Sequence, residues 1–430
     1  MADEAYEGRQ TFVNMGSLHG VEEARDGVAG EGAWFAAPPR FRVLAQLGQG
    51  GMANVHLAIA RGPVGFSKLV VLKSLRSDLV DDPAMVEMFL HEARLAARLN
   101  HPNVVQTFEV GVEAGQHAIV MEYLEGQTLA QIRRRAQGCA GGIPLEMHLR
   151  MLNDVLGGLH HAHELSDYDG TALGLVHRDV SPQNVFVTFD GQVKLLDFGI
   201  ATLTKGRRLE TQTGVLKGKI DYMSPEQMME AELDRRSDLF AVGIMLWEAA
   251  AGRPLWKGLS EVGVMNRVLN GDIPRLRDVN PWVSKGLERI CLKAMARSRE
   301  DRYATAAELQ IDLEREIAAM GGGVKQRDVG RFVADLFAAA RAERKTVIDL
   351  QVRRAARVSG GECDSFRPLL LPVLRKEPSS WSNSDLVPPM PRPTRLQKVS
   401  LAAWGAALSL GVACLLWWKT KGTRAMQLPT

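Results

Sequence analysis

The feature that most restricts the fold of this chain is a glycine-rich segment that leads into a β-strand pattern. The segment reads Leu47-Gly48-Gln49-Gly50-Gly51-Met52-Ala53-Asn54-Val55. Beyond it, Val55, Leu57 and Ile59 occupy alternate positions, which is the period of a strand. A dinucleotide-binding fold would place a helix here, and a P-loop would continue with Gly-Lys-Ser/Thr. We therefore predict a hairpin whose glycines let the backbone approach phosphate oxygens, although a plain turn would explain the glycines equally well.

Two charged residues that could form an ion pair follow on separate predicted elements. Lys73 ends the strand-like run Val70-Val71-Leu72-Lys73, and Glu92 lies in a helix-like stretch from 85 to 95. A lone lysine after a strand is usually a solvated surface charge, so the pairing depends on the other motifs. Further on, Ile119-Val120-Met121-Glu122-Tyr123-Leu124 is typical of a core strand.

Several short motifs with charged residues lie further along the chain. They are His177-Arg178-Asp179-Val180-Ser181-Pro182-Gln183-Asn184, Asp197-Phe198-Gly199, Ser224-Pro225-Glu226, a helix-like segment around Asp238, and Asp301-Arg302-Tyr303. Any one of these strings arises often by chance. Their fixed order between residues 47 and 303 does not, so we treat them as one constellation.

In this order the motifs resemble those of protein kinases, and most closely those of bacterial kinases of the eukaryotic type. The resemblance covers residues 41 to 320, about two thirds of the chain. It implies an α+β fold of two lobes, with a small β-rich amino-terminal lobe and a large helical carboxyl-terminal lobe. It also implies transfer of the γ-phosphate of ATP to serine or threonine hydroxyls of proteins, with Mg²⁺ as the cofactor or Mn²⁺ in its place.

The resemblance assigns the predicted site residues. Asp179 would accept the proton of the substrate hydroxyl, while Lys73, paired with Glu92, would hold the α- and β-phosphates, and these three are the predicted catalytic residues. Asn184 and Asp197 would bind the metal. The predicted nucleotide-binding residues come from the glycine-rich loop, the lysine strand and the connection between the lobes: Leu47, Gly48, Gln49, Gly50, Gly51, Val55, Lys73, Met121, Glu122 and Leu124.

The resemblance also implies structural roles. Glu226 would pair with Arg302, and Asp238 would hold the backbone of the catalytic loop that begins at His177 and Arg178. An arginine before the catalytic aspartate is typical of kinases in which a phosphate orders the activation segment. The predicted phosphosites, reached by autophosphorylation, are Thr211 and Thr213.

Two departures from the family pattern concern the transfer site. Ser181 stands where a lysine usually follows the catalytic aspartate by two residues, and Lys219 follows Gly218 where serine/threonine kinases carry a threonine. Our hypothesis is that Lys219 supplies the missing cation. The same positions separate serine/threonine from tyrosine kinases, so the expected specificity rests on overall resemblance. They also leave open a pseudokinase, or a membrane-tethered scaffold that binds ATP or partners with little transfer.

The rest of the chain divides by composition. Beside the kinase domain at 41–320, the predicted segments are a flexible leader at 1–40, a helical extension at 321–360, a Pro/Ser-rich linker at 361–398, an apolar segment at 399–418 and a short tail at 419–430. The extension contains a helical stretch from about 326 to 357, with apolar residues at helical spacing.

The segment 399–418 contains no charged residue and is long enough to cross the hydrocarbon core as one helix. A buried core helix is the alternative. Basic residues flank both ends, so orientation rests on the need of the kinase domain for ATP and Mg²⁺, which predicts a single-pass protein of the cell membrane with that domain in the cytoplasm. Small residues Ala403, Ala407 and Gly411 would let two such helices approach as a homodimer.

Charge and cysteine content exclude other classes. The formal net charge of +3 over 430 residues is too small to indicate nucleic acid as a partner. The four cysteines form no CxxC pair, so neither a zinc site nor a disulfide framework is predicted. The expected partners are ATP, protein substrates and the membrane.

Overall fold

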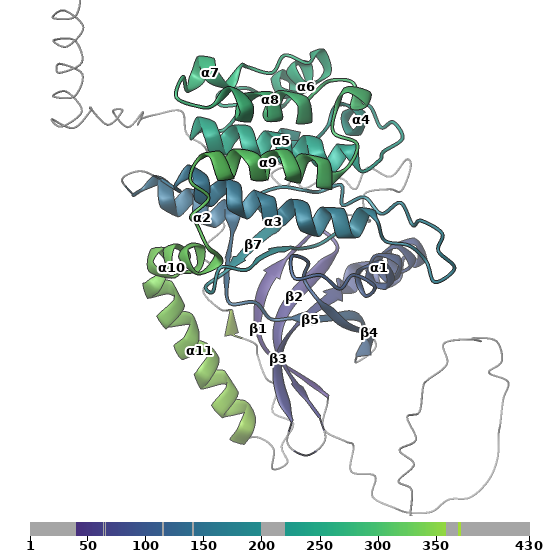
Figure 1. Ribbon diagram of the computed structural model, residues 1–430. Coiled ribbons are helices and arrows are strands. Elements are labelled where there is room, and N and C mark those ends of the chain that lie inside the picture. Colours follow the sequence, from purple (N-terminus) through teal and green to yellow (C-terminus); the bar gives the residue numbers. More distant parts are fainter. Residues whose placement is uncertain are drawn as a thin grey trace, which may run out of the picture.

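A computed structural model describes residues 40–62, 64, 66–113, 116–139, 142–198, 220–357 and 369–370. The described chain folds into two lobes, a β-rich amino-terminal lobe and a helical carboxyl-terminal lobe, which confirms the predicted two-lobed α+β fold (Figure 1). The predicted leader, except Arg40, and most of the predicted linker lie outside the described residues, as do the apolar segment and the tail.

The amino-terminal lobe is built on a six-stranded sheet with the order β4-β5-β3-β2-β1-β9. Its strands are β1 (Phe41–Gln49), β2 (Ala53–Arg61), β3 (Ser67–Leu75), β4 (Thr107–Glu113), β5 (Gln116–Glu122) and β9 (Leu369–Leu370). The predicted hairpin is confirmed, because β1 and β2 pair antiparallel up to Gln49 and Asn54, and Gly50 N donates to Ala53 O at 2.8 Å.

Helix α1 (Pro83–Ala96) packs against the β4–β5 side of this sheet. It starts sharply because Pro83 occupies the first turn and the Asp82 side chain accepts a hydrogen bond from Ala84 N. Its apolar face buries Phe89 and Ala93 with the sheet residues, so the same face turns Glu92 inward. A short 3₁₀ turn, η2 (Ser77–Leu79), leads into the helix.

The carboxyl-terminal lobe stacks helices around one apolar core. They are α2 (Leu129–Gln137), α3 (Leu145–His163), α4 (Pro225–Met228), α5 (Arg236–Ala251), α6 (Glu261–Asn270), α7 (Leu276–Val279), α8 (Lys285–Ala294) and α9 (Ala306–Ala319), with 3₁₀ turns η4 (Ile220–Tyr222) and η5 (Arg299–Asp301). Helix α5 is buried on nearly every face and ends at Gly252, whose φ of 67° closes the helix in the left-handed region. A three-stranded sheet, β6 (Gly126–Thr128), β7 (Val185–Thr188) and β8 (Val193–Leu195), lies between this core and the other lobe.

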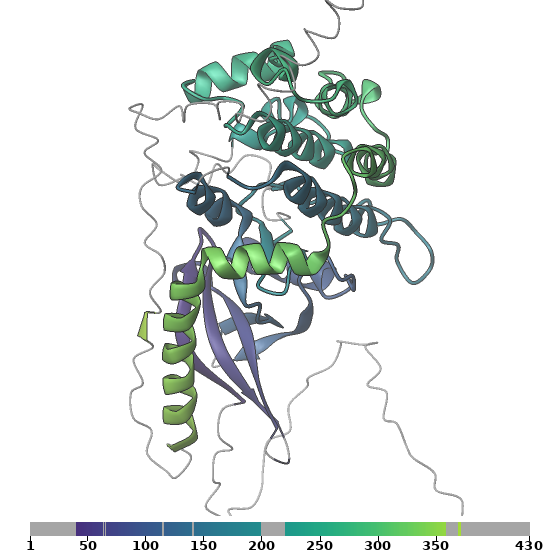
Figure 2. The ribbon, with the colours of Figure 1, turned by 60° about the vertical axis from the view of Figure 1, so that its left-hand side comes forward.

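The extension forms two helices, which corrects the single helical stretch predicted from about 326 to 357. They are α10 (Gln326–Leu336) and α11 (Ala338–Arg357). The chain breaks at Phe337, whose φ of −118° leaves the helical region while its ring packs into the carboxyl-terminal core. Figure 2 shows α10 against the carboxyl-terminal lobe and α11 running along β1 of the other lobe. The predicted domain boundaries stay predictions.

Within the described ranges, no helix has the length and apolar character needed to cross a membrane. The segment predicted to do so, 399–418, is outside those ranges.

Candidate active site

The ammonium group of Lys73 lies between two carboxylates. Its Nζ is 2.8 Å from Glu92 Oε1 and 2.8 Å from Asp197 Oδ1, so β3, α1 and the segment after β8 meet at one cation. The predicted pair of Lys73 and Glu92 is therefore confirmed as a contact. Burial alone would lower the pKa of Lys73, but the charges of Asp197 and Glu92 outweigh burial and raise that pKa. Lys73 therefore stays charged at physiological pH.

The glycine-rich loop lies one strand away from this cation. Val55 in β2 is the direct partner of Lys73 in β3, and β2 continues from the loop. A Cβ added to Gly48 or Gly51 would meet nothing within 4 Å, so the open space beside the loop is not filled by the protein. The predicted residues Leu47 and Gln49 lie at the end of β1, where this strand leads into the loop.

The connection between the lobes runs from the end of β5. Met121, a predicted nucleotide-binding residue, lines a small cavity behind Lys73, together with Glu92 and Phe198. Leu124 is partly buried in the connection itself.

A contact that the sequence analysis missed holds Glu122 in place. Its Oε1 accepts from Lys194 Nζ at 2.6 Å and from Gln106 N at 2.7 Å. Lys194 lies in β8 and is buried, so this ion pair joins the connection to the carboxyl-terminal lobe. A single lysine inside a short strand carries no periodic signal, which is why the sequence did not indicate it.

Asp238 holds the catalytic loop, which begins at His177, through hydrogen bonds to its backbone. This carboxylate is 1% exposed and accepts hydrogen bonds from His177 N and Arg178 N at 2.8 Å each, while His163 Nε2 lies 2.8 Å from its Oδ2. Burial alone would raise the pKa of Asp238, but the hydrogen bond and charge of His163 and the contacts from His177 outweigh it and lower the pKa. Asp238 thus stays ionised and fixes the backbone that carries Asp179.

The predicted metal residues meet beside this loop. Asn184 Nδ2 donates to the Asp179 carbonyl at 2.8 Å, and Leu196 N donates to the Asn184 carbonyl at 2.8 Å, one residue before Asp197. A carboxylate and an amide oxygen are ligands that Mg²⁺ accepts, so Asn184 and Asp197 fit such an ion and would hold it. When bound, the ion would neutralise charge on the phosphates.

Phe198 anchors the chain next to Asp197. Its ring is buried in a cluster with Leu95 and Leu99 beneath α1, and its centroid lies 4.6 Å from the His177 ring. This packing keeps Asp197 on the side that faces Lys73. The catalytic loop and the metal segment therefore support one another.

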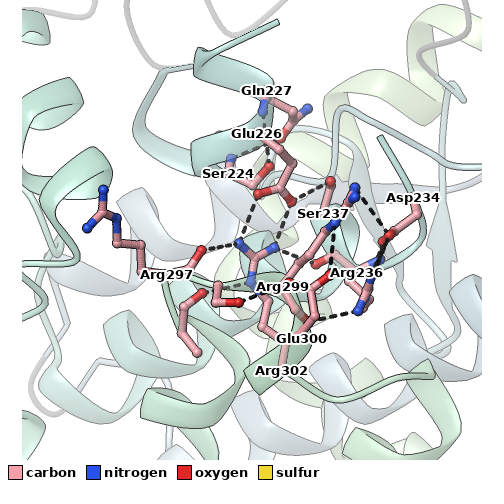
Figure 3. A network of polar contacts seen from close by, with 12 residues as sticks. Ser224, Glu226, Gln227, Asp234, Arg236, Ser237, Arg297, Arg299, Glu300 and Arg302 are labelled. Carbon is pink, nitrogen blue, oxygen red and sulfur yellow. Dashed lines mark hydrogen bonds and ion pairs between the residues drawn. The ribbon is translucent and has the colours of Figure 1, made fainter. Parts of the chain in front are cut away.

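Glu226 and Arg302 form the predicted ion pair, with Arg302 Nη1 and Nη2 donating to the two Glu226 oxygens at 2.7 and 2.9 Å (Figure 3). Ser237 Oγ also donates to Glu226, at 2.6 Å. Burial alone would raise the pKa of Glu226, but the hydrogen bonds and charge of Arg302 outweigh it and lower the pKa. The next residue, Gln227, donates its Nε2 to the Arg178 carbonyl at 2.8 Å, a contact that the sequence analysis missed.

Two positions bear on the departures and on regulation. Ser181 is 7% exposed, and its carbonyl accepts from Asn184 N at 3.0 Å, so it serves the turn of the loop. Arg178 has a φ of 68°, and its Nε and Nη1 are buried without a partner in the part of the chain that the structure describes. Thr211, Thr213 and Lys219 lie outside the described residues.

Comparisons with known proteins agree with this geometry. A model of the protein kinase domain matches residues 41–347. The chain is 42% identical over 292 residues to Tyrosine-protein kinase MasK of Myxococcus xanthus, covering 68% of this chain and 45% of that protein. It is 34% identical over 275 residues to Serine/threonine-protein kinase PrkC of Bacillus subtilis, covering 64% of this chain and 40% of that protein. The matched part thus spans less than half the length of these relatives.

Among solved structures, the kinase domain of PknI from Mycobacterium tuberculosis aligns with a TM-score of 0.48 and 27% identity. The alignment covers 67% of this chain and 100% of that domain. The protein kinase family model, matched to residues 41–347, spans the glycine-rich loop, the Lys73 cluster, the catalytic loop and the Glu226–Arg302 pair. This chain belongs to the protein kinase family, among the bacterial kinases of the eukaryotic type.

Proposed function

We propose that this chain transfers the γ-phosphate of ATP to serine or threonine hydroxyls of other proteins. The observation that carries the proposal is the pairing of Lys73 with both Glu92 and Asp197 at 2.8 Å, because it joins the phosphate-binding lysine to the metal-binding aspartate. Asp179, on a loop held by Asp238, would accept the proton of the attacking hydroxyl. Asn184 and Asp197 would hold Mg²⁺ or Mn²⁺.

Acceptor specificity is the finer part of the proposal. Several relatives at about 34% identity are named serine/threonine kinases, whereas MasK, at 42%, is named a tyrosine kinase. Ser181 and Lys219 depart from the serine/threonine pattern at the positions that separate the two classes. We favour serine and threonine on the number of relatives so named, and keep tyrosine as the second candidate.

The test incubates the full chain with Mg²⁺, radiolabelled ATP and casein, beside an Asp179→Asn variant. We expect labelled phosphoserine and phosphothreonine that disappear in the variant, because the aspartate is the proton acceptor. Phosphotyrosine alone would assign the chain to tyrosine specificity. Binding of nucleotide without any label would favour the pseudokinase, and a Lys219→Ala variant with unchanged transfer would refute the idea that Lys219 supplies the missing cation.

We also propose activation by autophosphorylation at Thr211 and Thr213. The support is Arg178, a partly buried residue with two buried side-chain nitrogens that have no partner among the described residues. Burial lowers the pKa of Arg178 despite the charge of Asp238, so an added phosphate would stabilise its charged form. Phosphopeptide mapping after incubation with ATP should place label between residues 200 and 220, and label found only elsewhere would contradict the proposal.

The proposed location is the cell membrane, with the kinase domain in the cytoplasm and the segment 399–418 as anchor and contact between two copies. The support is the uncharged apolar sequence of that segment. Fractionation of cells expressing the full chain or a form lacking 399–418 tests it. Equal amounts of both forms in the soluble fraction would refute the anchor.

A further inference from the structure

Helix α10 is fixed to the carboxyl-terminal lobe. Val329, Val333 and Phe337 are buried in the core of that lobe. Gly330 lies so close to the β7–β8 turn that an added Cβ would be 2.6 Å from the Asp190 carbonyl carbon and 2.7 Å from Gly191 N. Such a close backbone approach leaves α10 little freedom to move on the lobe.

Helix α11 presents one face to the amino-terminal lobe. The residues described as buried or partly buried along it recur at helical spacing: Ala340, Arg344, Val347, Ile348, Gln351 and Val352. Ile348 is 8% exposed and belongs to a cluster with Leu44 and Leu57 of the sheet. Because Phe337 alone separates the two helices, α10 and α11 together span both lobes on the side of β1 (Figure 2).

One predicted nucleotide-binding residue, Leu47, and Tyr123, the neighbour of two others, pack against the cluster that receives α11. Leu47 begins the glycine-rich loop, and Tyr123 lies in the connection between the lobes, between the predicted adenine neighbours Glu122 and Leu124. A third contact lies just beyond, where Arg344 Nη1 donates to the Gly126 carbonyl at 3.4 Å. The helix thus packs against the strand that leads into the glycine-rich loop and against the connection between the lobes.

We propose that α11 is a positioning element for the nucleotide, with Ile348 as its central residue. Ile348 would not touch the nucleotide; it holds Leu47 and Tyr123 at the separation that the base requires. Helix α10 anchors α11 to the carboxyl-terminal lobe and so fixes this separation relative to that lobe. Loss of the buried side chain would let the glycine-rich loop drift from the connection, which weakens binding more than it slows transfer. This inference rests on the proposed use of ATP.

The test compares four forms of the full chain: unmodified, Ile348→Ala, Ile348→Val and Leu350→Ala. Leu350 lies on the same helix but is 46% exposed, so it controls for changes in helix propensity. A further control, Ile290→Ala, removes a fully buried isoleucine from α8 in the carboxyl-terminal lobe. The readouts are the Kd of a fluorescent ADP analogue with Mg²⁺, the KM for ATP, and kcat.

We expect Ile348→Ala to raise the Kd and the KM by about tenfold while kcat stays within about twofold. Ile348→Val should restore most of the affinity, and Leu350→Ala and Ile290→Ala should bind as the unmodified chain does. An unchanged Kd for Ile348→Ala, or an equal rise for Ile290→Ala, would overturn the inference. Because the Kd needs no turnover, absence of transfer alone would refute only the proposed enzyme, whereas absence of binding by the unmodified chain would refute both.

Discussion

Arg302 and Glu226 meet inside the carboxyl-terminal lobe as a two-point ion pair, although 76 residues separate them in the sequence. The Arg302 side chain is 0% exposed and also donates to the carbonyls of Ala296, Arg236 and Arg297. Each nitrogen of the Arg302 guanidinium thus donates to at least one acceptor. The pair fixes α4 to the rest of the helical core.

Removing this arginine should strongly destabilise the lobe. Arg302→Met leaves the Glu226 carboxylate buried without its counter-ion, and we expect a loss of about 3–5 kcal/mol in the free energy of unfolding. Urea unfolding measures it. Arg315→Met is the matched control, because Arg315 is 73% exposed and its pair with Asp312 should be worth less than about 1 kcal/mol. Equal losses in both variants would contradict the assignment.

The hydrogen bonds to Asp238 predict a joint effect on stability and turnover. Asp238→Asn keeps the shape of the side chain but replaces one acceptor oxygen by an NH₂ group that faces backbone donors. We expect a loss of about 2 kcal/mol or more in stability and a marked fall in phosphoryl transfer, because the backbone before Asp179 loses its anchor. Asp169→Asn, at an exposed loop position, should change neither. Full activity in Asp238→Asn would show that the loop needs no anchor.

The pair of Lys73 and Glu92 predicts a defect in transfer. Glu92→Gln removes the charge that orients the ammonium but leaves the helix intact, so we expect kcat/KM for ATP to fall about 10- to 100-fold. Glu87→Gln is a control on the exposed face of the same helix. Steady-state kinetics separates them. If both variants behaved alike, Glu92 would have no specific role.

His148 in α3 predicts a loss of stability below neutral pH. Burial, with the nearby charge of Arg133, lowers its pKa from 6.5 to about 3. As pH falls below about 6.5, His148 binds a proton in the unfolded chain but stays neutral in the folded chain. The free energy of unfolding therefore decreases by about 2 kcal/mol between about pH 7 and 5. His148→Gln cannot titrate, so its unfolding free energy should fall less over that range. Parallel pH profiles for the two proteins would contradict the shift.

The contact of α10 predicts that Gly330 tolerates no side chain. Gly330→Ala would place a Cβ against backbone atoms of the β7–β8 turn, which cannot yield as a flexible side chain can. We expect a loss of about 1–3 kcal/mol in stability. Gly323→Ala, where a Cβ would meet nothing within 4 Å, is the control. Thermal unfolding compares them, and equal midpoints would argue against close packing of α10.

Contacts between residues of the recognised motifs were predictable from the sequence, and several contacts that involve a residue outside those motifs were not. Strand and helix patterns placed Lys73 and Glu92 on elements that the family packs together, and the late Arg302 was recognised with Glu226. The pairs Lys194–Glu122 and Gln227–Arg178 each depend on one polar residue in a buried segment, which leaves no periodic pattern. The role of such a residue can be recognised only when the structure shows which residue it contacts.

The extension illustrates a second limit. Apolar residues at helical spacing from Val329 to Phe337 predict a buried face but do not say which surface covers it. The break at Phe337 was missed because the residues around it include neither glycine nor proline. Ile348 and Val352 continue the apolar spacing beyond the break, and the change of direction sends them to the other lobe.

The long separation of Glu226 from Arg302 bears on how the protein folds and unfolds. Because helices α5 to α8 lie between the two residues, we expect the pair to close only after these helices have docked, and its energy to be gained late in folding. We therefore expect Arg302→Met to leave the refolding rate nearly unchanged and to accelerate unfolding by most of the lost free energy. The buried Glu226–Arg302 pair would then raise the kinetic barrier to unfolding and so determine how long the native lobe persists once it has formed.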